Sequence, residues 1–298
     1  MPKFSVVIPT FNRSEALQRA INSVLNQTFS DLEVIVVDDG STDDTEELVK
    51  GTKDRRLKYY WMQNSGGPAT PRNRGIEEAS GEWVCLLDSD DFWYPEKLEE
   101  VAKLTDRCPE LDAVYHGIVN RKKGRRPLKI ARGVTPDFYK ELLVNGNRCP
   151  TSSMSIKRSF IINKGLRFDE SSEFRVVEDY DFWMKLANAG ANFSFIDKIL
   201  GEYLLGDENI SSDFSKQRMN SLCVLKFHVF EVQSFEENKE KLWRNLRARH
   251  YARLAANDLK SGRVLLSINN AARSIALSPK HLYLRFLRTL ENRLSTSG

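Results

Sequence analysis

The chain has 298 residues, of which 41% are hydrophobic and 29% charged, and its formal net charge is +4. These are the values of an ordinary soluble protein that can bury a core, as one large domain or two smaller ones. No apolar run reaches about 18 residues, which excludes a membrane-spanning helix. The positive charge is concentrated at the end, where residues 241–298 contain twelve Lys and Arg but only Asp258 and Glu291 as acids.

The four cysteines and the amino terminus bear on the compartment. Cys85, Cys108, Cys149 and Cys223 are widely spaced, with no Cys-x-x-Cys pair and no His at ligand spacing. Neither a zinc site nor a disulfide framework is indicated, which favours a reducing compartment. The first residues lead directly into a strand, so no signal peptide is expected. We therefore predict a cytoplasmic protein.

Strand and helix patterns alternate through the first 90 residues. Ser14 opens an apolar helical stripe, Ser41 or Thr42 can cap a second helix, and a third is expected near Pro71–Ala79. Buried strands are predicted at residues 4–8, 33–37 and 57–61 and in the apolar run that begins at residue 81. This alternation predicts an α/β fold with a mostly parallel, Rossmann-like sheet and helices on both faces.

Polar clusters follow three of these strands. They are the loop from Thr10 to Arg13, the pair Asp38-Asp39, and the run Asp88-Ser89-Asp90. The carboxyl ends of parallel strands meet at one edge of a sheet, where ligands bind. Three such clusters are hard to explain as independent surface turns, so this edge is the predicted functional site.

The run from Gly81 to Asp91 points to a cation. Its apolar strand ends in three carboxylates within four residues, namely Asp88, Asp90 and Asp91. They repel one another, so positive charge is expected among them. A hard cation such as Mg²⁺ or Mn²⁺, held by one or two carboxylates plus phosphate oxygens, suits this arrangement. Asp-Ser-Asp is also good turn chemistry, and the run alone does not decide between the two.

The pattern changes beyond Asp91. Helices are predicted from Pro95 to about Asp106 and at residues 138–144 and 158–164, and strands at 113–120, 153–156, 191–195 and 198–204. A basic hairpin turn at residues 121–126 is either solvated or in contact with an anionic acceptor or a membrane surface.

Residues 177–187 form a helix ended by Gly190, with Glu178 and Asp179 at its amino terminus, where the dipole favours ionised carboxylates. These two acids are either helix caps or a general base with its neighbour.

The last part of the chain is predicted to be helical from Phe214 onward, broken at Ser261-Gly262 and Ser278-Pro279. Apolar stripes flank Gly262, as in one helical hairpin of a tetratricopeptide array or in helices that pack on the preceding domain. Basic residues alternate with apolar ones here. These helices either lie on an anionic membrane or turn their apolar faces inward. The aromatic residues fit helix faces better than stacking platforms, so nucleic acid is not expected.

The sequence resembles the family 2 glycosyltransferases with the A-type (GT-A) nucleotide-sugar-binding fold, over about residues 3–205. The likeness rests on five motifs in order: Val-Val-Ile-Pro-Thr-Phe-Asn-Arg (6–13), Val-Val-Asp-Asp-Gly-Ser-Thr-Asp (36–43), Pro-Arg-Asn-Arg-Gly (71–75), Leu-Asp-Ser-Asp-Asp (87–91) and Glu-Asp-Tyr-Asp-Phe-Trp (178–183). It implies a catalytic domain at 1–212, with a nucleotide-sugar-binding half at 1–91 and an acceptor-side half at 92–212. A helical region at 213–298 follows.

The resemblance also implies roles for single residues. Asp39 would accept from the nucleobase imide, Asp90 would bind Mn²⁺ or Mg²⁺, and Asp179 would be the catalytic base. The implied donor-binding residues are Pro9, Thr10, Phe11, Arg13, Asp39, Arg72, Asp88 and Ser89. Two stretches depart from the commoner pattern, namely the loop from Gly66 to Pro71 and the residues after Tyr203, where a basic residue is frequent. The second departure puts a metal or diphosphate contact from that loop in doubt.

The expected function is that of an inverting glycosyltransferase. A sugar would pass from a nucleotide-diphosphate sugar, with UDP the commonest in the family, to a hydroxyl of a glycan, a lipid-linked or another acceptor. The alternative is a catalytically silent module that binds a sugar nucleotide or a partner. A sugar nucleotidyltransferase is disfavoured because no Gly-rich loop follows the first strand, and dinucleotide enzymes and P-loop NTPases because their Gly-rich motifs are missing.

Overall fold

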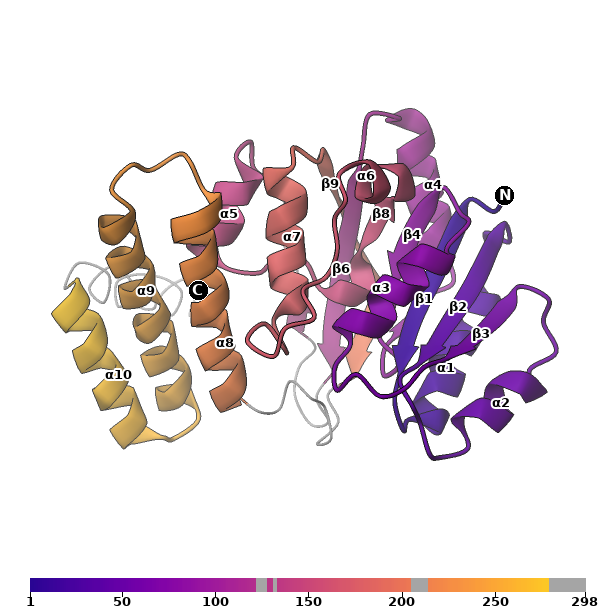
Figure 1. Cartoon of the computed structure of the whole chain (residues 1–298), viewed down its shortest axis with the longest axis horizontal. Coiled ribbons are helices and arrows are strands. Elements are labelled where there is room, and N and C mark those ends of the chain that lie inside the picture. The colour runs from indigo at the N-terminus through magenta and orange to yellow at the C-terminus, as the bar shows by residue number, and fades with distance from the viewer. Residues whose placement is uncertain (122–127, 131–132, 205–213, 279–298) are drawn as a thin grey trace, which may run out of the picture. The chain divides into compact units, whose positions relative to one another are not determined.

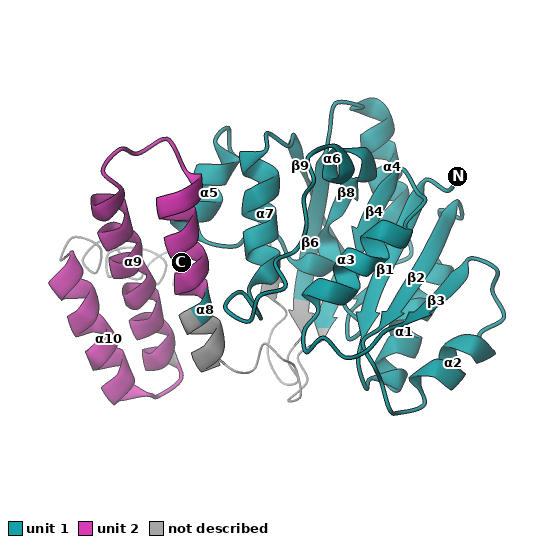
Figure 2. Ribbon diagram, in the orientation of Figure 1, with its two compact units in different colours: residues 1–220 teal, residues 221–298 magenta. Residues whose placement is uncertain are grey.

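The computed structural model describes residues 1–121, 128–130, 133–204 and 214–278. It divides into two compact units, residues 1–220 and 221–298 (Figure 2). The expected domain boundary, between residues 212 and 213, lies outside the described residues, as do most of the basic turn at 121–126 and the loop after Leu204.

A nine-stranded sheet forms the centre of the first unit (Figure 1). Its strands are β1 (Phe4–Thr10), β2 (Leu32–Asp38), β3 (Leu57–Trp61), β4 (Trp83–Leu86), β5 (Phe92–Trp93), β6 (Ala113–Arg121), β7 (Leu128–Ile130), β8 (Ser155–Lys157) and β9 (Phe193–Leu204). Their order is β3-β2-β1-β4-β8-β6-β9-β5, and β7 pairs with β6. The fold class predicted from the sequence is confirmed.

The two halves of the sheet are paired differently. β1 lies parallel to β2 and β4, and β2 lies parallel to β3, as the alternation of strands and helices predicted. In the second half, β8 lies antiparallel to β4 and β6, whereas β9 lies parallel to β6. The parallel half therefore brings the ends of β1, β2 and β4 to one edge.

The prediction of two closing strands was wrong, because β9 is continuous. Its register against β6 shifts after Ile196, and Ile199 is the next residue paired. The polar pair Asp197-Lys198 is accommodated there as a bulge, although in the sequence it resembled a break. β5, which pairs with β9, was not predicted because two residues are too short for a periodic signal.

Helices of the first unit flank the sheet and follow the predicted positions closely. They are α1 (Ser14–Leu25), α2 (Thr45–Gly51), α3 (Ala69–Glu78), α4 (Lys97–Arg107), α5 (Phe138–Asn145), α6 (Arg158–Asn163) and α7 (Glu178–Asn188). A 3₁₀ turn, η1, spans Thr151–Ser153. α2 begins three residues later than Thr42, so the predicted caps were wrong; neither Ser41 nor Thr42 caps it.

Alternate residues of β1 serve two apolar layers. Val6 and Ile8 share one core cluster with Leu17 and Ile21 of α1, which explains the helical stripe in the sequence. Val7 points the other way, toward α3, where a Cβ on Gly75 would lie 2.2 Å from Val7 Cγ1. Gly75 thus allows α3 to approach the sheet closely, and α3 carries Arg72 to the edge of the site.

The second unit contains a helical hairpin. α8 (Phe214–Phe227) crosses the boundary between the units and leads into a π-helical turn at His228–Val232. α9 (Lys239–Lys260) and α10 (Val264–Leu277) follow. The break at Ser261-Gly262 was predicted, and Gly262 has a φ of +74°. The break before Asn238 was not predicted from the sequence. The side chain of Asn238 accepts there from Lys241 N at 2.9 Å. No helix of the described residues is long and apolar enough to cross a membrane.

The apolar stripes predicted for the hairpin do not face inward on α10. Its buried residues are Ser267, Asn270 and Ser274, whose side chains bond to Ala255 O, Asp258 Oδ2 and Ala248 O of α9, each at 2.8 Å. Leu265 and Ile268 are 84% and 61% exposed. Small residues of α9 allow close approach, so short polar side chains can fill the seam.

Candidate active site

The loops after β1 and β2 are locked together. Asn12, with a φ of +50°, accepts at Oδ1 from Thr42 N at 2.7 Å, and its own N donates to Ser41 Oγ at 2.8 Å. Ser41 and Thr42 are used in this way rather than as caps of α2. The arrangement fixes the residue after Asn12, Arg13, at the start of α1.

Two acids stand at the end of β2: Asp38, its last residue, is structural, and Asp39, the next residue, is a candidate for binding. Asp38 accepts from Ser41 N at 2.8 Å and from the Tyr59 hydroxyl at 2.7 Å. Asp39 is 4% exposed, and its Oδ1 accepts from Ser65 N at 2.8 Å and from Ser65 Oγ at 2.9 Å. Burial nevertheless raises the pKa of Asp39. The role of Ser65 was missed, since in the sequence it is one residue of an ordinary loop.

Three of the residues expected to bind the donor lie at the end of β1 or directly after it. Pro9 and Thr10 are buried, whereas Phe11 is 43% exposed. Thr10 Oγ1 is buried and has no hydrogen-bond partner among the described residues. Thr10 is adjacent to Asp39, whose N donates to Thr10 O at 2.9 Å. A buried hydroxyl without a partner, beside a buried carboxyl, fits a polar ligand.

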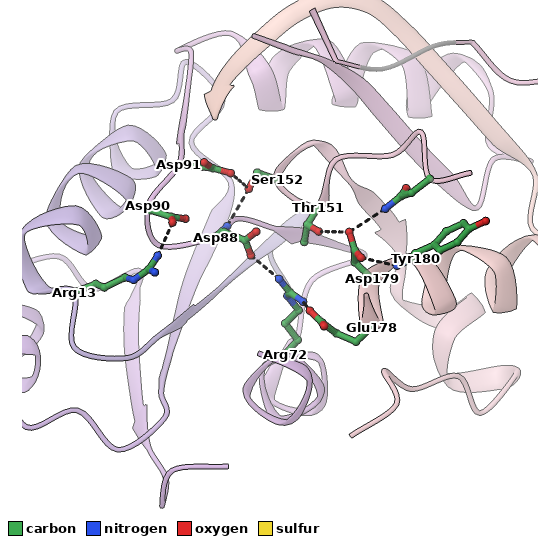
Figure 3. A network of polar contacts seen from close by, with 11 residues as sticks. Arg13, Arg72, Asp88, Asp90, Asp91, Thr151, Ser152, Glu178, Asp179 and Tyr180 are labelled. Carbon is green, nitrogen blue, oxygen red and sulfur yellow. Dashed lines mark hydrogen bonds and ion pairs between the residues drawn. The ribbon is translucent and has the colours of Figure 1, made fainter. Parts of the chain in front are cut away.

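The three acids that follow β4 have three different partners (Figure 3). Asp90 is ion-paired with Arg13, Asp88 Oδ1 accepts from Arg72 Nη2 at 2.7 Å, and Asp91 Oδ2 accepts from Ser152 Oγ at 2.5 Å. Ser89, which lies between Asp88 and Asp90 in the chain, is buried. The positive charge predicted among these acids is therefore supplied in part by two arginines of the chain.

Arg72 joins the two halves of the first unit. Its Nη1 donates to Glu178 Oε1 at 2.6 Å, and the guanidinium is 4% exposed. Burial by itself would lower the pKa of Arg72, but the carboxylates of Asp88 and Glu178 raise it. The resemblance implied that Arg72 binds the donor; in the structure both ends of its guanidinium bind carboxylates. One comes from the loop after β4 and one from the start of α7.

Asp179 lies at the amino terminus of α7 and is half-buried. Its Oδ1 accepts from Tyr180 N at 2.6 Å, and its Oδ2 accepts from Asn147 Nδ2 at 3.1 Å and Thr151 Oγ1 at 3.2 Å. Burial, and then repulsion by Glu178, raises the pKa of Asp179 to about 7, although Arg72 opposes the shift. These effects outweigh the helix dipole, which was expected to favour the ionised form.

Asp90 is the candidate metal ligand. No three His, Cys, Asp or Glu side chains within the described ranges are placed to hold a metal ion. The carboxylate of Asp90 does fit a hard cation that takes most of its oxygen ligands from a bound nucleotide and from water. Burial, and then the charge of Asp88, raises the pKa of Asp90, even though Arg13 opposes the shift. The surroundings of Asp90 thus favour additional positive charge.

Comparison with known proteins begins with the family. The model of glycosyl transferase family 2 matches residues 5–165. The chain is 30% identical over 261 residues to chondroitin synthase of Escherichia coli, covering 83% of this chain and 37% of the synthase. It is 51% identical over 94 residues to GalNAc(5)-diNAcBac-PP-undecaprenol beta-1,3-glucosyltransferase of Campylobacter jejuni, covering 30% of each protein. The matched residues span about a third of the length of each of these two relatives.

Solved structures agree on the fold. S. aureus TarS 1–349 in complex with UDP-GlcNAc matches with a TM-score of 0.70 at 23% identity, covering 94% of this chain and 82% of that chain. Mannosyltransferase PcManGT from Pyrobaculum calidifontis, in complex with GDP-Man and Mn²⁺, matches with a TM-score of 0.59 at 20% identity, covering 95% and 87%. The sheet of this chain is thus a GT-A sheet, and the acids of the matched segment lie at its carboxyl edge. The chain belongs to glycosyl transferase family 2.

Proposed function

We propose that the protein transfers a sugar from a nucleotide-diphosphate sugar to an acceptor hydroxyl, with inversion and with Asp179 as general base. The observation that carries the proposal is the half-buried carboxyl of Asp179, linked through Glu178 and Arg72 to the donor-side Asp88. Family membership disfavours the silent module. UDP is the proposed nucleotide, supported by the TarS complex with UDP-GlcNAc. A lipid-linked glycan is the proposed acceptor, supported by the Campylobacter relative.

The reaction is a single displacement. The acceptor oxygen attacks the anomeric carbon from the face opposite the diphosphate, and the bond to the diphosphate oxygen breaks as the new glycosidic bond forms. Asp179 takes the hydroxyl proton. A base is most effective when its pKa lies near the working pH, and such catalysis is worth roughly 10² to 10⁴ in rate. The pKa of about 7 for Asp179 meets this condition. An α-linked donor would give a β-glycoside.

The donor would lie along the carboxyl ends of β1, β2 and β4. Asp39 accepts from the base imide, Pro9, Thr10 and Phe11 border the base, and Asp88 and Ser89 contact the ribose or sugar. Arg13 and Arg72 contribute positive charge near the diphosphate. Asp90 would hold Mn²⁺ or Mg²⁺, which when bound offsets charge on the leaving diphosphate. Since Arg13 is paired with Asp90, the cation and Arg13 compete for one carboxylate.

The first test removes the base. Asp179→Asn keeps the shape of the side chain, and Asn caps a helix about as well as Asp, so the variant should fold. We expect transfer to fall by roughly 10² to 10⁴, with donor binding within a few-fold of wild type. Product formation with a panel of sugar nucleotides and calorimetry with UDP measure the two quantities. A wild-type kcat in the variant would remove Asp179 from the mechanism.

A second test concerns pH. Because the base must be ionised, kcat/KM should rise with pH through the Asp179 pKa of about 7. Glu178→Gln removes a repelling charge and leaves Arg72 less neutralised, and both changes favour ionised Asp179. The acid limb should therefore move to lower pH. Glu173→Gln, at an exposed acid, is the control and should leave the limb in place. An unmoved limb in Glu178→Gln would contradict the coupling.

A third test separates metal from base recognition. Asp90→Ala should abolish the Mn²⁺ dependence of UDP binding. Asp39→Ala should weaken binding roughly tenfold to a hundredfold with and without Mn²⁺, because a charge-assisted hydrogen bond is worth about 1.5–3 kcal/mol. Calorimetry with UDP, with and without Mn²⁺, measures both effects. If Asp90→Ala binds Mn²⁺ and UDP as the wild type does, the metal assignment is wrong.

We also infer that the second unit contacts an anionic membrane surface. Lys241 and Arg244 are exposed on α9, and Leu265 and Ile268 are exposed on α10. Each basic residue near such a surface contributes about 1 kcal/mol. The full chain should cosediment at low salt with vesicles of about one-third anionic lipid, and Leu265→Glu with Ile268→Glu should reduce that binding. If the wild-type protein remains in the supernatant, this unit has no membrane role.

A further inference from the structure

We propose that Asn147 and Thr151 are positioning residues for the base, and that the turn η1 ties the carboxyl of Asp179 to the loop after β4, residues 88–91, through Ser152. The inference rests on the proposed role of Asp179. Asn147, Thr151 and Ser152 lie outside the five motifs by which the sequence resembled the family. They form part of the connection between α5 and β8, which has no periodic pattern.

The contacts on the base side fix the plane of the carboxyl. Asn147 Nδ2 and Thr151 Oγ1 both donate to Asp179 Oδ2, and Tyr180 N donates to Oδ1. The amide of Asn147 is oriented in turn, because its Oδ1 accepts from Cys149 N at 3.0 Å. Thr151 is 8% exposed, so its hydroxyl has little access to water. Donors on both oxygens leave the carboxyl little freedom to rotate.

The contacts on the donor side come from the next residue of the same turn. Ser152 is 2% exposed; its Oγ accepts from Asp88 N at 3.1 Å and donates to Asp91 Oδ2 at 2.5 Å. Its carbonyl accepts from Trp93 Nε1 at 2.6 Å. Adjacent residues of η1 therefore bind the base and the loop that carries the donor-side acids (Figure 3).

Buried side chains hold the residues that contact the turn. The ammonium of Lys97 lies 3.7 Å from the centre of the Trp93 ring and donates to Ser155 Oγ at 3.0 Å. Within η1, Ser153 N and Ser153 Oγ both donate to Pro150 O, at 2.9 Å and 2.7 Å. Because the turn is held in this way, it can fix the base relative to the loop after β4.

The link has a chemical consequence. Attack on the anomeric carbon requires the base and the donor in a fixed relation, and small displacements cost large factors in rate. The charged and titratable groups around Asp179 are Glu178 on its own helix, Arg72 of α3, Asp88 after β4 and the Cys149 thiol. None of these donates a hydrogen bond to Oδ2 in the structure, whereas Thr151 does. Removing the hydroxyl therefore disfavours the ionised carboxylate and loosens its position.

The experiment compares Thr151→Val, which keeps the shape and loses the hydroxyl, with Thr151→Ser, which keeps the hydroxyl. For Thr151→Val we expect kcat at neutral pH to fall roughly tenfold to a hundredfold, as for the loss of one charge-assisted hydrogen bond. The acid limb should move to higher pH, and UDP binding should stay within a few-fold. Thr151→Ser should restore both the rate and the limb. A merely structural role would lower the amount of folded protein without moving the limb.

Two outcomes overturn different claims. If Asp179→Asn is inactive but Thr151→Val has a wild-type kcat and acid limb, the positioning role is wrong and the base assignment stands. If Asp179→Asn is active, the proposed base itself fails. Should Thr151→Val not fold, Asn147→Ala removes the other donor to Asp179 Oδ2, and Asn147 is exposed, so its loss should not unfold the protein. An unmoved limb there would also overturn the proposal, and a limb moved to higher pH supports it.

Discussion

A single buried guanidinium connects the two halves of the candidate active site. Arg72 reaches Asp88, in the loop after β4, and Glu178, at the start of α7. A cation taken out of water in this way costs several kcal/mol, which its two carboxylates offset. Removing any one of the three would leave an uncompensated buried charge, so the arrangement favours one relative position of the two halves. Asp179, the proposed base, is the next residue in the chain after Glu178 and shares this constraint.

Neutralising charges are distributed around the acids of the site. Arg13 pairs with Asp90, Arg72 with Asp88, and hydrogen bonds from Ser65 stabilise Asp39. Asp179 also accepts from neutral donors, but its carboxyl lies beside Glu178 and its pKa is raised to about 7. An acid in such surroundings can exchange a proton near neutral pH, as the proposed general base must.

The second unit follows a different packing rule from the first. In the first unit, apolar side chains of α1 and β1 fill the core, as hydrophobic burial requires. In the hairpin of α9 and α10, serine and asparagine fill a narrow seam between helices, and each finds an acceptor. Leucine and isoleucine on the other side of α10 are exposed. This exposed apolar face is the observation behind the membrane contact proposed above.

The order of strands and helices, the parallel half of the sheet and the acids at its edge could all be predicted from the sequence. Strand and helix periodicity are local properties, and parallel connections place strand ends together whatever the details of packing. Asp39, Asp88, Asp90 and Asp179 could be selected because they follow such elements directly or begin one. The five motifs by which the sequence resembled family 2 added roles that periodicity alone does not supply.

Only the tertiary structure decided how those acids are held. Asn147, Thr151, Ser152 and Ser65 lie in irregular segments, and their importance depends on contacts between residues distant in the chain, such as Thr151 with Asp179. The raised pKa of Asp179 has the same origin, since burial and a neighbouring charge act through space. The sequence left open which face of α10 is exposed, for a related reason. Helical periodicity shows that a helix has an apolar face, but only the shape of the facing helix determines which face is buried.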